Sequence, residues 1–339
     1  MKKILILFIA IITSGSADAQ ALKKYGKEVV EQALKLVGKE SIESSDIIIK
    51  RVFKDDIAEN ILDRYDDDIL EKLAKEVSEN SELKGLLTSN NSAFKTWLLL
   101  GNTKASKNIE VIKYFSNIMD DLGEQGLKNK YVFQQSGDIL IIKSKKGRQM
   151  ASINNDIITA KPWKGNKDLN PLLNELQLIP NSTFKINGQY YKTLENGQYK
   201  EISGVLTHLP KNKPARSIKI QAQSKKVKGG IPVIENGRIV RTQSGNPVYK
   251  DDGGHIVANV FGGGSEMYNL IPMSSKINRQ GGAWAQMERR WEKAIREGEK
   301  VDYKITPIYK GSSQRPDKLY VTYEIEGKRV TELFDNNVF

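Results

Sequence analysis

A change of pattern close to Tyr131 constrains this chain more than any other feature of its sequence. Before it, apolar residues recur at the spacing of amphipathic helices, most clearly at Ile57, Ile61, Leu62, Tyr65, Ile69, Leu70, Leu73 and Val77. After it, short β-like runs are separated by Gly-containing turns such as Ser136-Gly137-Asp138, which is typical of hairpins. We therefore expect an α+β protein, with a helical N-terminal region followed by a domain built on an antiparallel sheet with flanking helices.

Two local features of this pattern give further expectations. The run Asp66-Asp67-Asp68 lies within the helical pattern, and on an amphipathic helix such a run is usually a solvated face without chemistry. A polar break at residues 164–167 precedes a short segment that we expect to be helical and to end near Pro180. From there on, strands and turns dominate.

The N-terminus has the order of a signal peptide. Lys2 and Lys3 precede an apolar run over residues 4–12, and Ala17-Asp18-Ala19 precedes Gln20, which gives the charged, apolar and small-residue sequence of a cleavable signal. The apolar run is too short to span a bilayer, and no later segment has the length of a membrane helix. These features predict a secreted or periplasmic protein with no membrane partner.

Composition narrows the class of partner. The 339 residues include 53 Lys and Arg against 41 Asp and Glu, a formal net charge of +12, which favours a polyanionic partner. The chain has no cysteine, so disulfides, thiol catalysis and cysteine-ligated zinc are excluded. Basic residues gather at 211–216 and 225–230; they form either a flexible linker or a rim that grips phosphates independently of base sequence.

The candidate catalytic residues begin with the segment Asp252-Gly253-Gly254-His255, which contains one of the two histidines of the chain. An unperturbed histidine titrates near pH ~6.5, so it can accept a proton from water at neutral pH, as phosphodiester hydrolysis requires. Such a base must stay neutral, which is consistent with a metal held by an uncharged Asn. Apolar residues at helical spacing from 282 to 296 place Asn278 near a helix start and Glu288 inside that helix, with Trp284 and Trp291 in the core.

From about Leu178 to the C-terminus, these residues resemble the DNA/RNA non-specific endonuclease family, in its secreted and toxin-type branch, whose active site has the ββα-metal fold. The family's Asp-x-Gly-His motif is matched by residues 252–255, and its Asn-x-x-Pro segment by residues 269–272. A second Asn nine residues after Asn269 is matched by Asn278, and the helix Glu by Glu288. Two features depart from the family: Gly253 stands where many members have Arg, and Gly281-Gly282 is an additional pair.

The resemblance implies a role for each matched residue. His255 would be the general base, and Asn278 the direct protein ligand of a hydrated Mg²⁺ or Mn²⁺. Glu288 would orient water at the metal, Asn269 would brace the site, and Asp252 would fix the turn rather than touch substrate. The reaction implied is cleavage of DNA and RNA that leaves 5′-phosphate ends.

Phosphate-binding arginines are expected near this motif. Arg238 and Arg241 are candidates that the sequence does not separate, and Arg279 is a third. The expected domain order is a signal peptide at 1–19, a helical domain at 20–127, a small β-containing connecting region at 128–177 and the nuclease domain at 178–339.

Other functions stay open at this point. The same lysines could serve a non-catalytic basic module that binds extracellular nucleic acid or an anionic surface polymer. Within the nuclease hypothesis, the chain could be an antibacterial toxin with a dedicated inhibitor, or a scavenging nuclease. His208 has no acidic or Asn companion at informative spacing, and we expect it to be structural. Serine-hydrolase, zinc-protease and phosphate-loop motifs are absent from the sequence.

Overall fold

The structure, a computed structural model, describes residues 45–53, 55–163, 169–175, 178–209, 232–235, 238–242 and 251–338. The predicted signal peptide and both basic stretches at 211–216 and 225–230 lie outside these residues. The chain divides into two compact units, Met1–Lys84 and Gly85–Phe339.

The first unit is helical. Its described helices are α3 (Ser45–Val52), α4 (Asp55–Arg64), α5 (Asp67–Glu79) and the start of α6 (Ser81–Ser89), and apolar residues such as Ile49 and Leu73 are buried in it. The helical pattern seen over residues 57–77 comprises two helices, α4 and α5, and Asp66 caps the start of α5. Its side chain accepts a hydrogen bond from the backbone N of Ile69 at 3.1 Å, which satisfies an amide at the helix start. Asp66 is therefore a helix cap, and it is exposed to solvent together with Asp67 and Asp68, as expected of this run.

The second unit begins with α7 (Asn91–Leu100), the short 3₁₀ helix η1 (Lys104–Lys107) and α8 (Ile109–Lys130). Asn90 and Asn108 cap α7 and α8 by accepting from Ala93 N and Val111 N. The pattern change at Tyr131 is confirmed, because α8 ends there and β1 (Val132–Ser136) pairs with β2 (Ile139–Lys143) as an antiparallel hairpin.

One large sheet runs through this unit. Its ten strands lie in the order β1-β2-β3-β4-β5-β6-β7-β12-β13-β14, and neighbours are antiparallel except for the parallel pair β4 and β5. The remaining bounds are β3 (Gln149–Asn154), β4 (Ile157–Ala160), β5 (Thr183–Ile186), β6 (Gln189–Thr193), β7 (Tyr199–Leu206), β12 (Val301–Tyr309), β13 (Pro316–Ile325) and β14 (Lys328–Asp335). The expected α+β class is confirmed. The expected short helix before Pro180 is wrong, because residues 169–175 form turns closed by bonds such as Leu173 N to Asn170 O.

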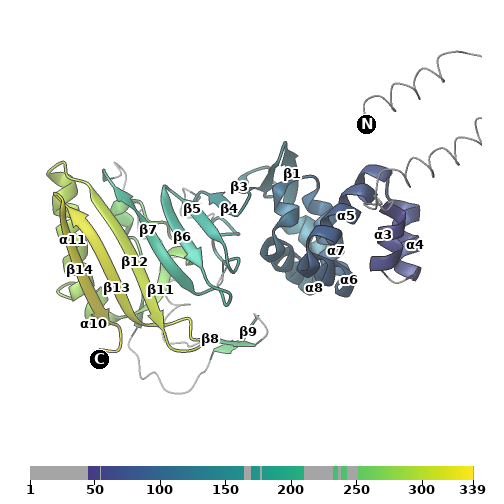
Figure 1. The fold of residues 1–339 in the computed structure, drawn as a ribbon. Helices are drawn as coiled ribbons and strands as arrows, with labels where there is room; N and C mark the ends of the chain where they lie inside the picture. Colours follow the sequence, from purple (N-terminus) through teal and green to yellow (C-terminus); the bar gives the residue numbers. More distant parts are fainter. Residues whose placement is uncertain are drawn as a thin grey trace, which may run out of the picture. The chain divides into compact units, whose positions relative to one another are not determined.

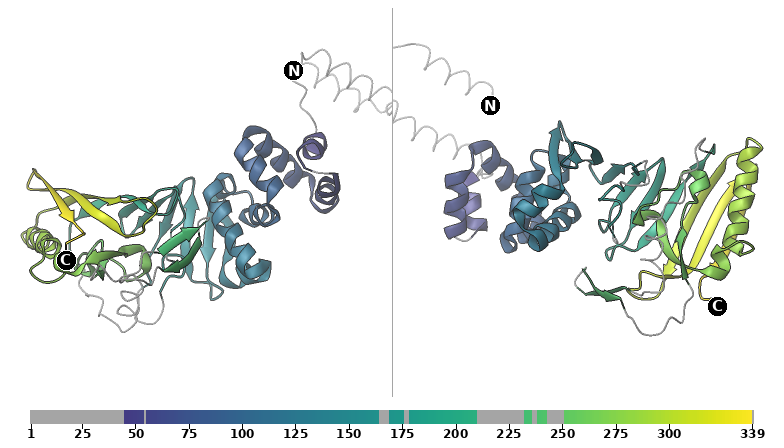
Figure 2. Two further views of the ribbon diagram at one scale, coloured as in Figure 1. Left: turned by 90° about the horizontal axis from the view of Figure 1, so that it is seen from below. Right: turned by 180° about the vertical axis from the view of Figure 1, so that it is seen from behind.

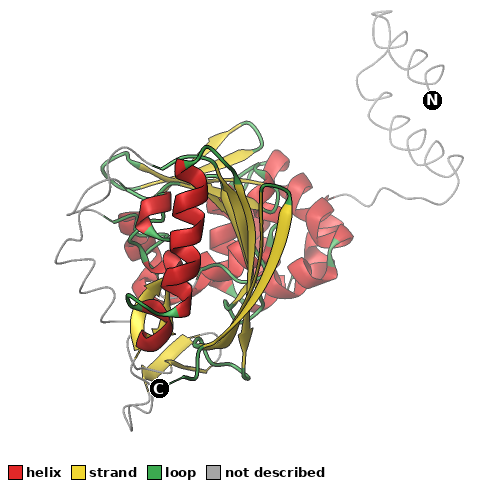
Figure 3. Ribbon diagram, turned by 90° about the vertical axis from the view of Figure 1, so that its left-hand side faces the viewer, coloured by secondary structure: helices red, strands yellow, loops and turns green. Residues whose placement is uncertain are grey.

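Helix α11 (Ala283–Arg296) covers one face of the last three strands, as Figures 1, 2 and 3 show from different sides. The ring of Trp284 meets Phe334 with centroids 5.1 Å apart, and the ring of Trp291 meets Tyr303 at 5.2 Å. Both tryptophans are buried, so their predicted place in the core is confirmed. These large aromatic contacts fix the helix on the sheet.

Two small sheets complete the unit. One pairs β10 (Asp251–His255) with β11 (Leu270–Ser274), and the other pairs β8 (Pro232–Glu235) with β9 (Arg238–Thr242). The domain boundary expected near Leu178 lies between β4 and β5, which are neighbours in the large sheet; the boundaries stay predictions. None of the helices within the described ranges has both the length and the apolar character of a membrane span.

Candidate active site

The residues of the sequence motif gather on the β10–β11 hairpin and the two helices that follow it. In this hairpin Asp252 lies opposite Met273, and His255 lies opposite Leu270. The chain then forms α10 (Ser275–Asn278) and α11. Two strands followed by helix give the ββα order that the sequence predicted.

The glycines of the motif serve the strand rather than a turn. A Cβ atom on Gly254 would stand 2.6 Å from the Cβ of Met273, closer than atoms of that kind approach. Glycine therefore lets β10 and β11 pack tightly here. Asp252 and His255 are the two half-buried positions of β10, while the other three are buried. The expected tight turn at the glycines is wrong, and these two side chains instead keep contact with solvent along one strand.

His255 is the last residue of β10, at the point where the chain enters the loop that leads to β11. Its side chain is half-buried, and its Nε2 atom is buried. Asp252, three residues earlier, lies about 10 Å away along the strand. The ring is therefore partly open to solvent, with Nε2 on its inner side.

Asn269 ties together the loop that follows His255. Its Oδ1 accepts from Val257 N at 2.9 Å, and its Nδ2 donates to Val257 O at 2.8 Å and to Gly264 O at 2.9 Å. The residue is fully buried, so these bonds satisfy an amide that has no access to bulk water. Gly263 allows this arrangement, because a Cβ there would stand 2.7 Å from Asn269 Nδ2.

Asp252 joins the strand to α10. One of its oxygens, Oδ2, accepts from Asn278 Nδ2 at 3.1 Å and from Arg279 Nε at 3.0 Å, while Oδ1 accepts from Arg279 Nη2 at 2.9 Å. The carboxylate raises the pKa of the Arg279 guanidinium through this two-point hydrogen bond and its charge. The guanidinium side of the pair is two-thirds exposed, which keeps it available to other anions. Asp252 is thus a strand residue that holds two neighbours, and the role of fixing a turn does not describe it.

Asn278 occupies the last position of the short helix α10, shortly before α11 begins at Ala283. The hydrogen bond from Nδ2 to Asp252 fixes the plane of its amide, so Oδ1 is turned away from Asp252. Gly282 makes the turn between α10 and α11 possible, because a Cβ there would stand 2.3 Å from two carbonyl oxygens, those of Lys276 and Ile277. The additional glycine pair of this sequence therefore sets the angle at which Asn278 is presented.

Glu288 lies inside α11, as expected. Its Oε1 accepts from Trp284 Nε1 at 3.1 Å. Burial raises the pKa of Glu288 from its ordinary value to about 7, and this outweighs the Trp284 hydrogen bond and the charge of Arg289, which both lower it. The carboxyl group thus changes charge near neutral pH.

A buried ion pair anchors Asp251, the first residue of β10, and this pair was not predicted from the sequence. Arg315 donates to both oxygens of Asp251, at 2.7 and 2.9 Å, and both side chains are almost fully buried. Asn336, also buried, donates to Pro272 O at 3.0 Å and accepts from Ser274 N at 2.7 Å. The partners are 62 to 64 residues apart in sequence, so no local pattern could have found them.

A second connection reaches the loop after His255 from outside the motif. Glu266 is buried, and its Oε1 accepts from the backbone N of Trp163 at 2.9 Å and of Asn170 at 3.3 Å. Burial raises the pKa of Glu266, although these backbone bonds oppose the rise. The run Gly262-Gly263-Gly264 was the available signal that this loop is tightly packed.

The remaining predicted residues are Arg238, Arg241 and His208. Arg238 and Arg241 belong to β9, but their side chains lie outside the described residues. His208 is exposed, and its Nδ1 lies 3.1 Å from Thr207 Oγ1. Within the described ranges, no group of three or more His, Cys, Asp or Glu side chains could hold a metal ion. A metal at this site would therefore depend on other donors, of which Asn278 Oδ1 is one.

Known proteins share parts of this chain. Two curated relatives, the type VII secretion system protein EssD of Staphylococcus aureus strains USA300 and NCTC 8325 / PS 47, are 41% identical over 83 residues, which cover 23% of this chain and 14% of theirs. The match thus spans about a seventh of the length of these relatives.

Two solved structures are also similar. The Sda1 nuclease with a bound zinc ion is 19% identical, with a TM-score of 0.31, over 44% of this chain and 74% of its own. NucA of Streptococcus agalactiae with a bound magnesium ion is 12% identical, with a TM-score of 0.30, over 66% of this chain and 90% of its own. Likeness at these TM-scores is too low to support a conclusion.

The family comparison is more direct. The model of the family described as DNA/RNA non-specific endonuclease matches residues 180–327, a stretch that includes the hairpin, both helices and every residue of the proposed site. This segment of the chain is a domain of the DNA/RNA non-specific endonuclease family.

Proposed function

We propose that this protein is a metal-dependent endonuclease that hydrolyses phosphodiester bonds in DNA and RNA without reading their sequence. The observation that carries the proposal is that Asp252 and His255 are the two half-buried side chains of β10. His255 ends the strand, and Asp252, near its start, holds the amide of Asn278 and the guanidinium of Arg279. This arrangement supports the assignment of a base, an oxygen donor and a cation to one site.

His255 is proposed as the general base. Its half-buried ring at the end of β10 keeps contact with solvent, which supports its assignment to accept the proton of the attacking water. Asn269 supports this role by holding the loop that begins at Ile256, directly after His255.

Asn278 is proposed as the protein ligand of Mg²⁺ or Mn²⁺. The donor fits, because an amide oxygen is a ligand that hard divalent cations accept, and Mg²⁺ commonly keeps several waters beside one or two protein oxygens. The bond from Asn278 Nδ2 to Asp252 leaves Oδ1 as the donor atom. A bound divalent cation would supply positive charge to the phosphate and to the departing 3′ oxygen.

Two further side chains complete the proposal. Glu288, as a carboxylate, is assigned to accept hydrogen bonds from water near the site, which makes its charge state near neutral pH relevant. Arg279 is assigned to bind a substrate phosphate, which would replace Asp252 as the partner of its guanidinium. Arg238 and Arg241 stay proposals of the same kind. The products are expected to carry 5′-phosphate ends.

The cellular setting is also a proposal. The N-terminal signal pattern supports a secreted or periplasmic protein. The EssD relatives are named as proteins of a secretion system, which fits export of this protein. An antibacterial role, which predicts a dedicated inhibitor, and a scavenging role both stay proposals. Such an inhibitor would be needed for harmless cytoplasmic production of residues 178–339.

Digestion of nucleic acid with matched histidine variants tests the proposal. Supercoiled plasmid and a structured RNA are incubated with the wild-type protein in EDTA, Mg²⁺ or Mn²⁺, beside His255→Ala and His208→Ala. We expect cutting of both substrates only with metal, a loss of about 10²-fold or more in His255→Ala, and wild-type cutting in His208→Ala, since that histidine is exposed and apart from the site. Intact plasmid and RNA under all metals and pH values, with binding retained, would instead support a non-catalytic nucleic-acid-binding module.

A further inference from the structure

The turn between β2 and β3 concentrates positive charge. The segment from residue 139 to 155 holds Lys143, Lys145, Lys146 and Arg148 and no acidic residue. Three of these, Lys145, Lys146 and Arg148, are exposed. The next acidic residue, Asp156, lies in the turn at the opposite end of β3. Nothing in this segment itself neutralises the charge at the turn.

Backbone bonds give the turn a defined shape. Ser144 N donates to Arg148 O at 2.8 Å, and Gly147 N donates to Ser144 O at 2.8 Å. Gly147 has a φ of 76°, which glycine adopts more readily than any other residue. Lys145 Nζ also donates to Asn129 Oδ1, near the end of α8. The charges are therefore carried on an ordered turn.

Trp163 holds the side chain of Arg148 in place. The guanidinium of Arg148 lies 4.1 Å from the centre of the Trp163 ring, a cation–π contact. Trp163 Nε1 donates to Gln149 O at 3.2 Å, so the ring is itself held in place. Lys161, two residues before Trp163, is exposed and adds a further charge beside the turn. We call Lys143, Lys145, Lys146, Arg148, Lys161 and Trp163 the basic turn.

The basic turn is connected to the proposed active site through two steps. The backbone N of Trp163 donates to Glu266 Oε1 at 2.9 Å. The backbone O of Glu266 accepts from Asn269 N at 3.1 Å, and Asn269 holds the loop that follows His255. The turn is thus anchored to the same loop as the proposed base, although it lies outside residues 180–327 that match the nuclease family.

We propose that the basic turn is an accessory nucleic-acid-binding surface that holds the sugar-phosphate backbone of the substrate away from the bond being cut. Ordered, exposed cations that are anchored to a nuclease site fit a polyanionic strand, and such contacts give affinity without base specificity. The inference rests on the proposed endonuclease function and adds a second substrate contact to it. An anionic membrane is the other partner that such charge could attract.

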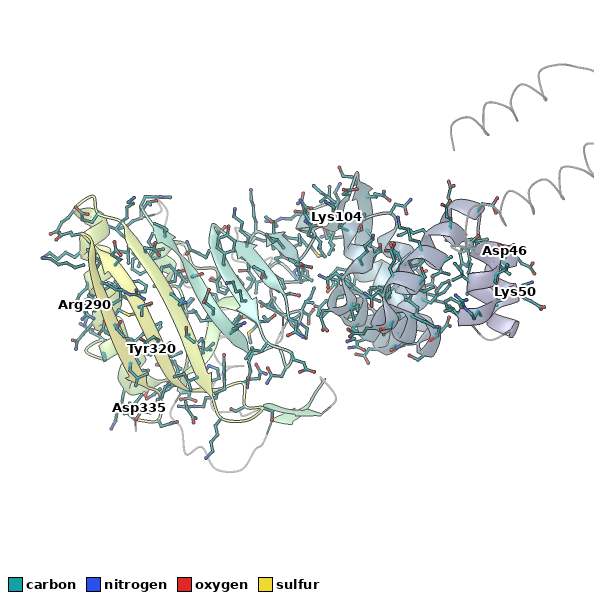
Figure 4. All side chains as sticks on the ribbon, in the orientation of Figure 1. Asp46, Lys50, Lys104, Arg290, Tyr320 and Asp335 are labelled. Carbon is teal, nitrogen blue, oxygen red and sulfur yellow. The ribbon has the colours of Figure 1, made fainter. Side chains whose placement is uncertain are left out.

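Binding by a variant with three neutralised charges tests the proposal. Lys145→Gln, Lys146→Gln and Arg148→Gln are combined in the full chain, with His255→Ala in the background, and binding of a fluorescein-labelled duplex of about 20 base pairs is measured in EDTA by anisotropy across salt concentrations. We expect affinity to fall about tenfold at low salt and the slope of log K against log salt to become shallower by about 2 to 3. The matched control, Lys318→Gln, Lys328→Gln and Arg329→Gln, removes the same charge from exposed positions on β13 and β14. Figure 4 labels Tyr320 of β13 and Asp335 of β14. The control should bind as the unmodified protein does.

Cleavage separates this proposal from the proposed function. With His255 intact and Mg²⁺ present, the triple variant of the basic turn should have a raised KM for the duplex and an unchanged kcat. Duplex binding equal to that of the control variant, or a loss confined to vesicles containing phosphatidylglycerol, overturns the accessory surface even if the protein cuts DNA. A wild-type protein that does not cut overturns the nuclease function, and the metal-free binding measurement still decides whether the basic turn binds nucleic acid.

Discussion

The two sides of β10 use adjacent aspartates for opposite purposes. Asp251 is buried against Arg315, and the pair is enclosed by the end of the chain around Asn336. Asp252 is half-buried and holds Asn278 and the exposed guanidinium of Arg279. The same two-point pairing of Arg with Asp therefore serves the framework on one side and the open site on the other. The two pairs differ in solvent access: the buried guanidinium of Arg315 keeps its partner, whereas the exposed guanidinium of Arg279 can exchange its partner.

The largest effect is expected from removing the buried ion pair between Arg315 and Asp251. Replacing one partner of a buried ion pair leaves the other charge buried without compensation, which costs about 3–5 kcal/mol. We expect Arg315→Met to lower the free energy of unfolding of the second unit by that amount, as measured by urea denaturation. Combining it with Asp251→Leu should recover a large part of the loss, since no unpaired charge is left. An unchanged free energy of unfolding in Arg315→Met would mean that the pair of Asp251 and Arg315 does not stabilise the fold.

Substitution of Asp252 should change the activity of the protein rather than its stability. Asp252→Asn removes the charge that orients Asn278 and Arg279, and loss of a partner that orients a metal ligand typically lowers metal affinity or activity about 10- to 100-fold. We expect plasmid cleavage to fall by that factor while the melting temperature stays near that of the wild type. A fall in both quantities to the same extent as in Arg315→Met would remove the distinction between the two sides.

Glu288 differs from both aspartates, because it is a half-buried carboxyl group held by a neutral donor rather than by an arginine. Its folded-state pKa of about 7 lies above the ordinary value, so the folded protein keeps a proton that the unfolded chain has lost. The free energy of unfolding should therefore fall as pH rises from about 4.5 to about 7, by about 1–3 kcal/mol. Urea denaturation in EDTA at several pH values measures this fall. In Glu288→Gln this part of the pH dependence should vanish, and an identical pH profile in both proteins would argue against the raised pKa.

The smallest effect is expected at Arg279. Its guanidinium is exposed, and exposed ion pairs contribute little to stability. Arg279→Gln should leave the melting temperature unchanged but make the salt dependence of kcat/KM shallower by about 1. Unchanged salt dependence would mean that Arg279 does not contact substrate phosphate, and Arg329→Gln, which removes an exposed charge from β14, provides the matched control.

The sequence predicts those parts of the molecule that depend on local spacing. The α+β class, the hairpin after Tyr131 and the buried faces of Trp284 and Trp291 follow from periodicity, which reports burial along a single element. The positions of His255, Asn269, Asn278 and Glu288 on the hairpin and its helices follow from motif spacing. Their roles stay predictions.

The missed features have physical reasons. Asp66 looked like part of a helix face, because a cap and a solvated position both favour aspartate. The bonds of Arg315 to Asp251, of Asn336 to β11 and of Trp163 to Glu266 join residues 62 to 103 positions apart. Such contacts are set by the tertiary fold, and no pattern in the neighbouring sequence reports them.

A double-mutant cycle of cleavage rates tests most directly whether His255 and Asn278 act on one phosphodiester. Rates of plasmid nicking in Mg²⁺ are measured for wild type, His255→Ala, Asn278→Ala and the double variant, with folding checked by thermal melting. Groups that act as a unit are strongly non-additive, so each single variant should lose about 10²-fold or more, and the double variant should be no slower than the slower single one. Two independent losses that multiply in the double variant, or wild-type cutting by either single variant, would contradict the proposed site.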